Sequence, residues 1–159
     1  KDIDDLARQV VAANAAMGCK VALAESCTGG LVAGALTEIA GSSAVLERGF
    51  VTYSNEAKME LLGVSSDIIE TFGAVSIACA WAMAQGALKR SHADVAVAIS
   101  GVAGPGGGTI HKPVGTVVFA RVMRGDGSQP EGELKAFGDL GRAEIRRQAT
   151  LCALELLLP

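Results

Sequence analysis

Short apolar segments that end in glycine-rich turns alternate along this chain with longer segments of helical periodicity. The clearest is Val-Ala-Val-Ala-Ile, in a strand expected over 94–99 that leads into the glycine-rich segment 100–108. The apolar run 20–24 is followed by a polar Gly-Gly turn and a helical pattern over 31–40, which Gly41 closes. Short apolar runs bounded by turn residues are typical of buried strands. Strands that alternate with helices indicate an α/β fold.

The remaining segments fit the same class. Further strands are expected over 49–53, 115–122 and 133–137, and the turn signal 124–127 makes the last two an antiparallel hairpin. Glycine stops and serine caps place the helices over 3–17, 56–62, 67–72, 77–90 and 142–158. The helix 77–90 is apolar almost all round, so we expect it to be buried. We therefore predict one domain over 1–159, an αβα sandwich with a mostly parallel sheet and an antiparallel hairpin near the C-terminus.

Composition argues against several classes of protein. Half of the 159 residues are hydrophobic and 19% are charged, which does not suit a disordered chain. The net charge is −3 and no basic patch stands out, so nucleic acid is not an expected partner. The longest apolar run, 77–84, is far shorter than the roughly 20 residues of a membrane span. Four cysteines without a CxxC pair indicate a reduced, cytoplasmic protein, and two histidines are too few for a histidine-rich metal site.

Two glycine-rich segments mark where a ligand is expected, because ligands bind beyond the carboxyl ends of strands in open α/β sheets. The segment 25–30 runs into a helix, whose first N–H groups attract anions. The alternative is that the glycines only form tight turns. No GxGxxG, P-loop or GxSxG pattern is present, so dinucleotide and ATP binding lack their usual support. The candidate binding residues are Thr28, Gly29, Gly30, Ser100, Gly101, Ala103 and Gly104.

Ser26 lies at a strand end just before a helix, where a nucleophile is expected, and a hydroxyl nucleophile needs a base. Lys58 is a candidate base if burial lowers its pKa from about 10.4 to about 7–8. The alternatives are a helix cap for Ser26 and a solvated surface position for Lys58. Tyr53 is either a core residue or a group that relays a proton or orients the lysine. Cys27 is a rival nucleophile, ranked second.

Arg142 and Arg146 lie one turn apart at the start of the last expected helix. A pair of guanidinium groups there would suit a phosphate monoester. The alternative is an ordinary solvated helix face.

Five motifs in order resemble the C-terminal domain family of the competence/damage-inducible protein CinA, which includes stand-alone nicotinamide-nucleotide amidases. They are Ala-Glu-Ser-Cys-Thr-Gly-Gly at 24–30, Tyr-Ser-Asn-Glu-Ala-Lys at 53–58, Gly-Ala-Val-Ser at 73–76, Ser-Gly-Val-Ala-Gly-Pro at 100–105 and Lys-Pro-Val-Gly-Thr-Val at 112–117. The likeness covers nearly the whole chain. Two stretches depart from the family pattern: Gly106 replaces an aspartate, and the Phe-Pro-Gly-Asp-Arg stretch is altered before Arg142.

The resemblance implies hydrolysis of a small-molecule substrate, nicotinamide mononucleotide, to nicotinate mononucleotide and ammonia. It implies Ser26 as nucleophile, Lys58 as base and Tyr53 beside them, with no metal or cofactor. Two other hypotheses remain: a nucleotide-binding module without turnover, and a serine–lysine amidase of different substrate. The apolar helices around Trp81 and near the C-terminus pack either against each other or against a second copy, as in a homo-oligomer.

Overall fold

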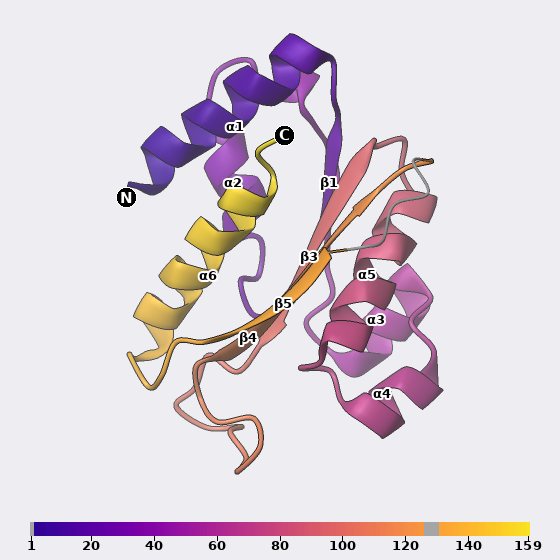
Figure 1. Ribbon diagram of the computed structural model, residues 1–159, viewed down its shortest axis with the longest axis vertical. Helices are drawn as coiled ribbons and strands as arrows, with labels where there is room; N and C mark the ends of the chain where they lie inside the picture. Colours follow the sequence, from indigo (N-terminus) through magenta and orange to yellow (C-terminus); the bar gives the residue numbers. More distant parts are fainter. Residues whose placement is uncertain (1, 126–130) are drawn as a thin grey trace.

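A five-stranded sheet forms the centre of the computed structural model, which describes residues 2–125 and 131–159. The strands are β1 (Val21–Glu25), β2 (Leu46–Val51), β3 (Val95–Gly101), β4 (Thr116–Met123) and β5 (Glu131–Ala136). The helices are α1 (Ile3–Met17), α2 (Leu31–Thr37), α3 (Asn55–Leu62), α4 (Ser66–Phe72), α5 (Ile77–Lys89) and α6 (Arg142–Leu156), with a short 3-10 helix η1 (Ser42–Ala44). Helices α1, α2 and α6 cover one face of the sheet and α3, α4 and α5 the other (Figure 1), which confirms the αβα sandwich.

The strand order is β2-β1-β3-β4-β5. Strands β2, β1 and β3 run parallel, whereas β4 pairs antiparallel with both β3 and β5. The predicted C-terminal hairpin is therefore confirmed as a pairing of β4 with β5. Part of its predicted turn lies outside the described residues. The parallel strands β1 and β2 end at the same edge of the sheet, which brings the segments that follow them close together.

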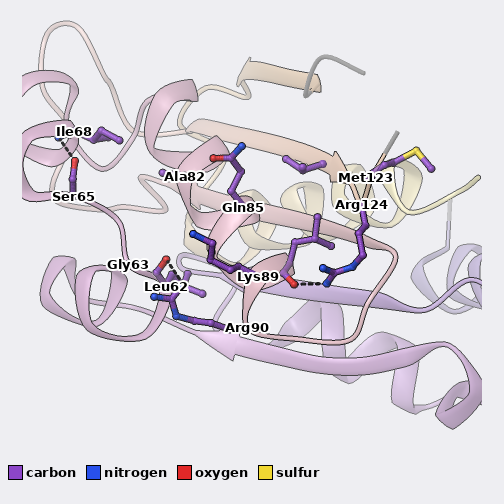
Figure 2. Close-up of a pocket in the computed structure, with 14 residues that line it drawn as sticks. Leu62, Gly63, Ser65, Ile68, Ala82, Gln85, Lys89, Arg90, Met123 and Arg124 are labelled. Carbon is purple, nitrogen blue, oxygen red and sulfur yellow. Dashed lines mark hydrogen bonds between the residues drawn. The ribbon is translucent and has the colours of Figure 1, made fainter. Parts of the chain in front are cut away.

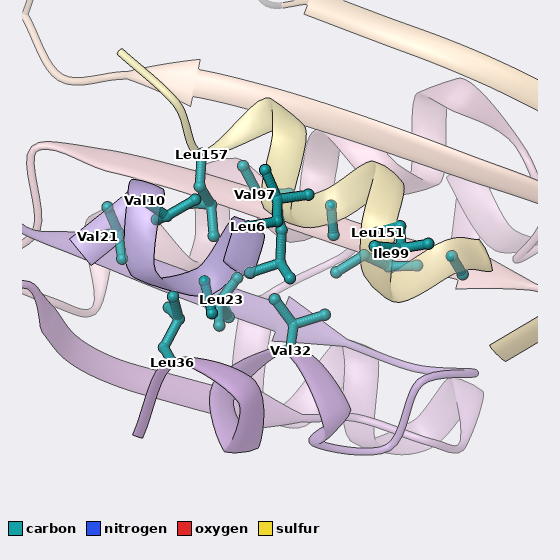
Figure 3. Close-up of a cluster of buried hydrophobic side chains, with 14 of the residues drawn as sticks. Leu6, Val10, Val21, Leu23, Val32, Leu36, Val97, Ile99, Leu151 and Leu157 are labelled. Atoms are coloured by element: carbon teal, nitrogen blue, oxygen red, sulfur yellow. The ribbon is translucent and has the colours of Figure 1, made fainter. Parts of the chain in front are cut away.

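The two sheet faces differ in side-chain size because successive residues of a strand point to opposite faces. Large side chains such as Val21, Leu23 and Val97 pack with α1, α2 and α6 (Figure 3). Small ones such as Ala22 and Ala96 face the helices on the other side. Helix α5 can therefore lie close to the sheet.

Several element boundaries differ from the sequence prediction. Helix α2 ends at Thr37 rather than at residue 40, and β2 begins at Leu46 rather than at 49. Strand β3 continues through Ser100 and Gly101, although their composition predicts a loop, because they pair with Val118 and Val117 of β4. A Cβ atom on Gly101 would lie 2.8 Å from the Thr116 carbonyl oxygen, so the close pairing requires glycine.

Helix α5 is not buried all round as predicted. Ile77 and Trp81 lie on its exposed side, with 45% and 39% of their surface accessible. In residues 2–125 and 131–159, no helix has both the length and the apolar character needed to cross a membrane.

Candidate active site

Ser26 and Lys58 meet at the edge of the sheet where β1 and β2 end. Ser26 directly follows β1, and its N–H donates to the Ile99 carbonyl of β3. Lys58 lies on α3, which Ser54 caps by accepting a hydrogen bond from the N–H of Ala57. The Lys58 Nζ atom lies 3.0 Å from Ser26 Oγ. This is hydrogen-bonding distance, so the amine can exchange a proton with the hydroxyl.

Lys58 is a buried lysine with 1% of its surface exposed, because it shares one face of α3 with Leu62, four residues on. Nζ also donates to the Thr52 carbonyl at 3.0 Å, and no carboxylate of the described residues forms an ion pair with it. Burial lowers the pKa of Lys58 because an uncompensated ammonium is poorly solvated there. The alternative of a solvated surface lysine is therefore wrong.

Cys27 is a poor rival nucleophile. Its thiol is buried beside the Ser26 turn, and burial raises its pKa to about 11. Since the thiolate is the reactive form, a thiol with this pKa is inert at neutral pH. The structure thus favours the hydroxyl of Ser26 over the thiol of Cys27.

The N-terminus of α2 does not offer free N–H groups to an anion, contrary to our expectation. The buried carboxylate of Glu25 occupies it and accepts four hydrogen bonds, at 2.6–3.1 Å, from Thr28 Oγ1 and from the N–H groups of Gly30, Val32 and Ala33. The favourable field of the helix N-terminus therefore acts on a carboxylate of the protein itself. The Thr28 hydroxyl is also committed to Glu25, so it does not face a ligand.

Hydrogen bonds also fix the rest of the turn after Ser26. The N–H of Gly29 donates to the Ser26 carbonyl, and Arg146 donates to the carbonyls of Cys27 and Thr28 at 3.0 and 3.3 Å. The N–H groups of Cys27 and Thr28 donate to no other described residue. Buried backbone N–H groups normally have a partner. These two, directly after Ser26, are therefore suited to hold an oxygen of a ligand.

Arg142 connects three segments near the site. Its guanidinium donates to the Gly104 carbonyl at 2.7 Å and to the Tyr53 hydroxyl at 2.8 Å. Tyr53 is 60% exposed, so it is not a core residue, and its hydroxyl bonds Arg142 rather than Lys58. Arg142 and Arg146 therefore bind different loops and do not form one guanidinium fork. Arg142 remains exposed, whereas Arg146 is half-buried against the Ser26 turn.

The second predicted binding segment faces a neighbouring loop. The Ser100 hydroxyl is buried and donates to the Ala74 carbonyl at 2.9 Å, while Lys112 donates to the carbonyl of Val75. These bonds attach the loop before α5 to the end of β3 and to the loop between β3 and β4. Ala103 is buried, and Gly104 presents its carbonyl to Arg142.

Two of the hollows in the described part of the chain lie at opposite ends of β4. One of about 640 Å³ lies between the end of α3, α5 and the end of β4 (Figure 2), and neither Ser26 nor Lys58 lines it. Its Arg90 and Arg124 donate to carbonyls at the ends of α3 and α5. These guanidinium groups therefore cap helices and are not available to bind an anion. The other, of about 560 Å³, is also not lined by Ser26 or Lys58, but its lining residues 105–109 directly follow Gly104, whose carbonyl Arg142 binds. We regard it as the better candidate for the substrate because of that proximity.

Sequence reasoning missed two residues of this site. Glu25 is a charged residue in an otherwise apolar strand, directly before a glycine-rich turn, and this position was a usable signal. Thr52 carried no signal, because its part depends on a main-chain carbonyl. In the described part of the chain, no three His, Cys, Asp or Glu side chains lie where they could hold a metal ion.

Taken together, the fold and these contacts define an α/β domain with a buried serine–lysine pair at the carboxyl end of strand β1. The model of the CinA C-terminal domain family matches residues 3–159. The protein therefore belongs to the CinA C-terminal domain family.

Relatives with several names share this domain. "Nicotinamide-nucleotide amidohydrolase PncC" of Enterobacter agglomerans is 49% identical over 158 residues, which are 99% of this chain and 94% of that protein. The protein of the same name from Escherichia coli strain K12 is 52% identical over 98% of this chain and 93% of its own length. A CinA-like protein of Mycobacterium marinum is 51% identical over 98% of this chain, which spans only 35% of that longer protein.

A solved structure agrees with the fold described here. The competence/damage inducible protein CihA from Agrobacterium tumefaciens is 53% identical and superposes with a TM-score of 0.95. The match covers 99% of this chain and 94% of that one.

Proposed function

We propose that the protein hydrolyses the carboxamide of nicotinamide mononucleotide to give nicotinate mononucleotide and ammonia. The observation that carries the proposal is the contact of 3.0 Å between Lys58 Nζ and Ser26 Oγ at a strand end. The substrate comes from the names of relatives that are 49% and 52% identical over almost their full lengths. A reaction that needs only a hydroxyl and an amine agrees with this site.

In the first step, the neutral Lys58 amine takes the proton of Ser26 as Oγ attacks the carboxamide carbon. The lowered pKa of Lys58 supports this role, because the amine must be free of its proton to act as a base. The carbonyl oxygen of the substrate becomes an oxyanion. The N–H groups of Cys27 and Thr28 are our candidates to stabilise it, and losing one such donor typically costs about 3–4 kcal/mol.

In the second step, the C–N bond breaks and the Lys58 ammonium returns its proton to the leaving nitrogen, which departs as ammonia. The acyl group remains as an ester on Ser26 Oγ. Lys58 then takes a proton from a water molecule that attacks this ester. Cleavage of the ester bond releases the nicotinate product, and the proton returns to Ser26. Tyr53 reaches this step only if its hydroxyl leaves Arg142, so we place it at the edge of the site.

The phosphate of the substrate would lie near Arg142 and the glycine-rich loop after β3. The Arg142 side chain is exposed, and it already joins Gly104 to Tyr53 at the border of the hollow of about 560 Å³. The Gly29–Gly30 turn and the segment Ser100–Ala103 would contribute main-chain atoms. Arg146 would act indirectly, since it holds the carbonyls of the Ser26 turn.

Ammonia release from nicotinamide mononucleotide tests the proposal. Ser26→Ala and Lys58→Ala should each lower kcat by at least about a thousandfold, since triad residues have effects of this size or larger. Ser66→Ala and Lys89→Ala, at exposed positions on α4 and α5, serve as matched controls. Release from Ser26→Ala within tenfold of the wild type would overturn the mechanism.

The two other hypotheses predict different results in the same assay. A binding module would bind the nucleotide but release no ammonia even as the wild type. An amidase of different substrate would cleave other amides better than the nucleotide, so a panel of amides with and without the phosphate separates it from our proposal.

We also propose a cytoplasmic location, no nucleic-acid partner and self-association. The four cysteines are free thiols, as in a reducing compartment. Ile77 and Trp81 expose apolar surface on α5, and a second copy would cover it. Sedimentation of the wild type and of Trp81→Glu tests this: a dimer that the substitution dissociates supports the interface, whereas a monomeric wild type contradicts it.

A further inference from the structure

The Lys58 amine has fewer hydrogen-bond acceptors around it than its charged form requires. An ammonium has three N–H donors. In the described residues Nζ has two partners, Ser26 Oγ and the Thr52 carbonyl, each at 3.0 Å. The neutral amine has two N–H donors and one lone pair, so two partners leave one site unpaired, which costs less in an uncharged group than in an ammonium. The proposed reaction, however, protonates Lys58 at every turnover, and the third N–H then needs an acceptor.

The Thr52 hydroxyl is available for this purpose. Thr52 is fully buried, and its Oγ1 is the one buried side-chain nitrogen or oxygen in residues 2–125 and 131–159 without a hydrogen bond. It belongs to the residue whose carbonyl already binds Nζ. The N–H of Thr52 donates to the Glu25 carbonyl at 2.9 Å, which fixes this main chain against β1. An unpartnered buried hydroxyl is unfavourable, so its presence beside a buried amine calls for an explanation.

The direction of the Thr52 side chain also agrees with such a contact. Phe50, two residues earlier, packs with the cluster of small residues on the α5 side of the sheet. Side chains two residues apart along extended chain point to the same face. Thr52 therefore faces the layer that contains α3 and Lys58.

We propose that the Thr52 hydroxyl is a positioning residue that accepts the third N–H of the Lys58 ammonium when Ser26 gives up its proton. The proposal requires a rotation about the Thr52 Cα–Cβ bond that brings Oγ1 to the ammonium. The inference rests on the proposed function, because it needs a reaction that protonates Lys58. The hydroxyl has no partner in the resting state, and its hydrogen bond to the ammonium is stronger than one to the neutral amine would be. Interactions of that kind raise kcat rather than tighten substrate binding.

Among the residues that the structure describes, no other group near Lys58 is placed to compensate its charge. The Cys27 and Cys79 thiols act on it from the Ser26 turn and from α5, and burial raises the pKa of both, which keeps them neutral. The Glu25 carboxylate already accepts four hydrogen bonds from the α2 N-terminus. Arg146, on the far side of the turn, binds its carbonyls. The carbonyl and hydroxyl groups of Thr52 are therefore the dipoles available to stabilise the charge on Lys58.

Thr52→Val tests the inference, because valine has nearly the same shape and lacks the hydroxyl. We expect kcat for ammonia release to fall by about tenfold to a hundredfold, which is the range for a hydrogen bond to a charged group. The KM should stay within about twofold. Loss of the acceptor destabilises the ammonium and lowers the pKa of Lys58, so the acidic limb of the kcat/KM profile should move to lower pH. Thr52→Ser, which keeps the hydroxyl, should retain kcat within about threefold of the wild type.

Stability separates this role from a structural one. Valine removes a buried hydroxyl without a partner, so the Tm of Thr52→Val should equal or exceed that of the wild type. Thr71→Val, at an exposed position on α4, is the matched control and should change neither Tm nor kcat. A Thr52→Val protein with unchanged kcat and an unmoved acidic limb would overturn the inference.

An aryl sulfonyl fluoride distinguishes failure of the inference from failure of the proposed function. Ser26 Oγ attacks its sulfur, fluoride leaves and Lys58 takes the proton, so labelling needs the pair but no amide substrate. If Thr52→Val slows labelling by about tenfold or more, the inference stands even where the wild type releases no ammonia from the nucleotide. If labelling and turnover are both unaffected, the inference is wrong and the amidase proposal survives.

Discussion

Replacement of Glu25 by glutamine should weaken both the fold and the proposed reaction. The carboxylate accepts four hydrogen bonds from Thr28 and from the first turn of α2. The amide oxygen of glutamine can replace Oε1 and keep three of them, but its NH2 group then meets the N–H of Ala33. One hydrogen bond to a charged acceptor is lost, at about 1.5–3 kcal/mol. The remaining three weaken because a neutral acceptor is weaker than a charged one.

We therefore expect Glu25→Gln to lower the free energy of unfolding by about 3 kcal/mol, out of a total of about 5–15 kcal/mol. For a chain of this size this corresponds to a fall in Tm of about 6–12 °C. Because the same carboxylate fixes the turn that presents Ser26, kcat should fall by at least about tenfold.

Thermal unfolding followed by circular dichroism measures the first effect, and ammonia release measures the second. Glu38→Gln, an exposed change at the other end of α2, serves as the control. It removes the same charge, and the Glu38 carboxylate accepts no hydrogen bond from another described residue. If the two variants have the same Tm within about 2 °C and the same kcat, the Glu25 carboxylate does not hold the turn, and the reasoning is wrong.

Three further predictions concern other parts of the structure. Burial holds the pKa of Lys58 below its usual range. At a pH between that lowered pKa and about 10.4, the Lys58 ammonium of the unfolded chain therefore loses its proton on folding. Lys58→Met should therefore be inactive but more stable at pH 7, with a gap in Tm that narrows as the pH rises toward 10; a gap independent of pH would contradict this. Gly86→Ala should destabilise by about 1–3 kcal/mol in urea unfolding, because its Cβ would lie 2.0 Å from the Leu62 carbonyl oxygen, whereas Gly34→Ala meets nothing within 4 Å and should not destabilise. Cys27→Ala should keep ammonia release within about threefold of the wild type, and a larger loss would revive the thiol as nucleophile.

Local signals in the sequence located most of the elements correctly. Ser54, Ser65 and Ser76 each cap the helix that follows by accepting a backbone N–H, and Gly18 and Gly63 end α1 and α3. Caps and stops are predictable because they depend on residues within one turn of each other. The alternation of strands and helices then suffices for the fold class.

The errors arise where distant pairing decides the structure. Glu47 and Arg48 are charged, so the sequence pattern did not indicate that β2 begins at Leu46. Strand β2 can include them because it is an edge strand, which can keep charged side chains in solvent. Ser100 and Gly101 have loop composition but become strand through their pairing with β4. Propensity along the chain contains no information about such partners.

The candidate site was only partly predictable for the same reason. Ser26 and Lys58 could be proposed from motifs, and the structure brings them into contact, while their catalytic roles stay predictions. Tyr53 bonds Arg142, which is 89 residues away, instead of the expected lysine. The contacts of Glu25 depend on N–H groups at the start of α2, and that of Thr52 on its own carbonyl. A sequence does not reveal where a carbonyl or an N–H will point.

The two members of the pair come from different parts of the sandwich, since Ser26 follows strand β1 of the sheet and Lys58 lies on helix α3. Cys27, next to Ser26, packs in the core beneath α1, α2 and α6, whereas Leu62, one turn from Lys58, packs in the core beneath α5. An intermediate with only one layer assembled would thus leave the hydroxyl without its amine. During refolding, recovery of turnover reports the docking of both halves of the molecule, and it should lag behind any spectroscopic probe that senses either half alone.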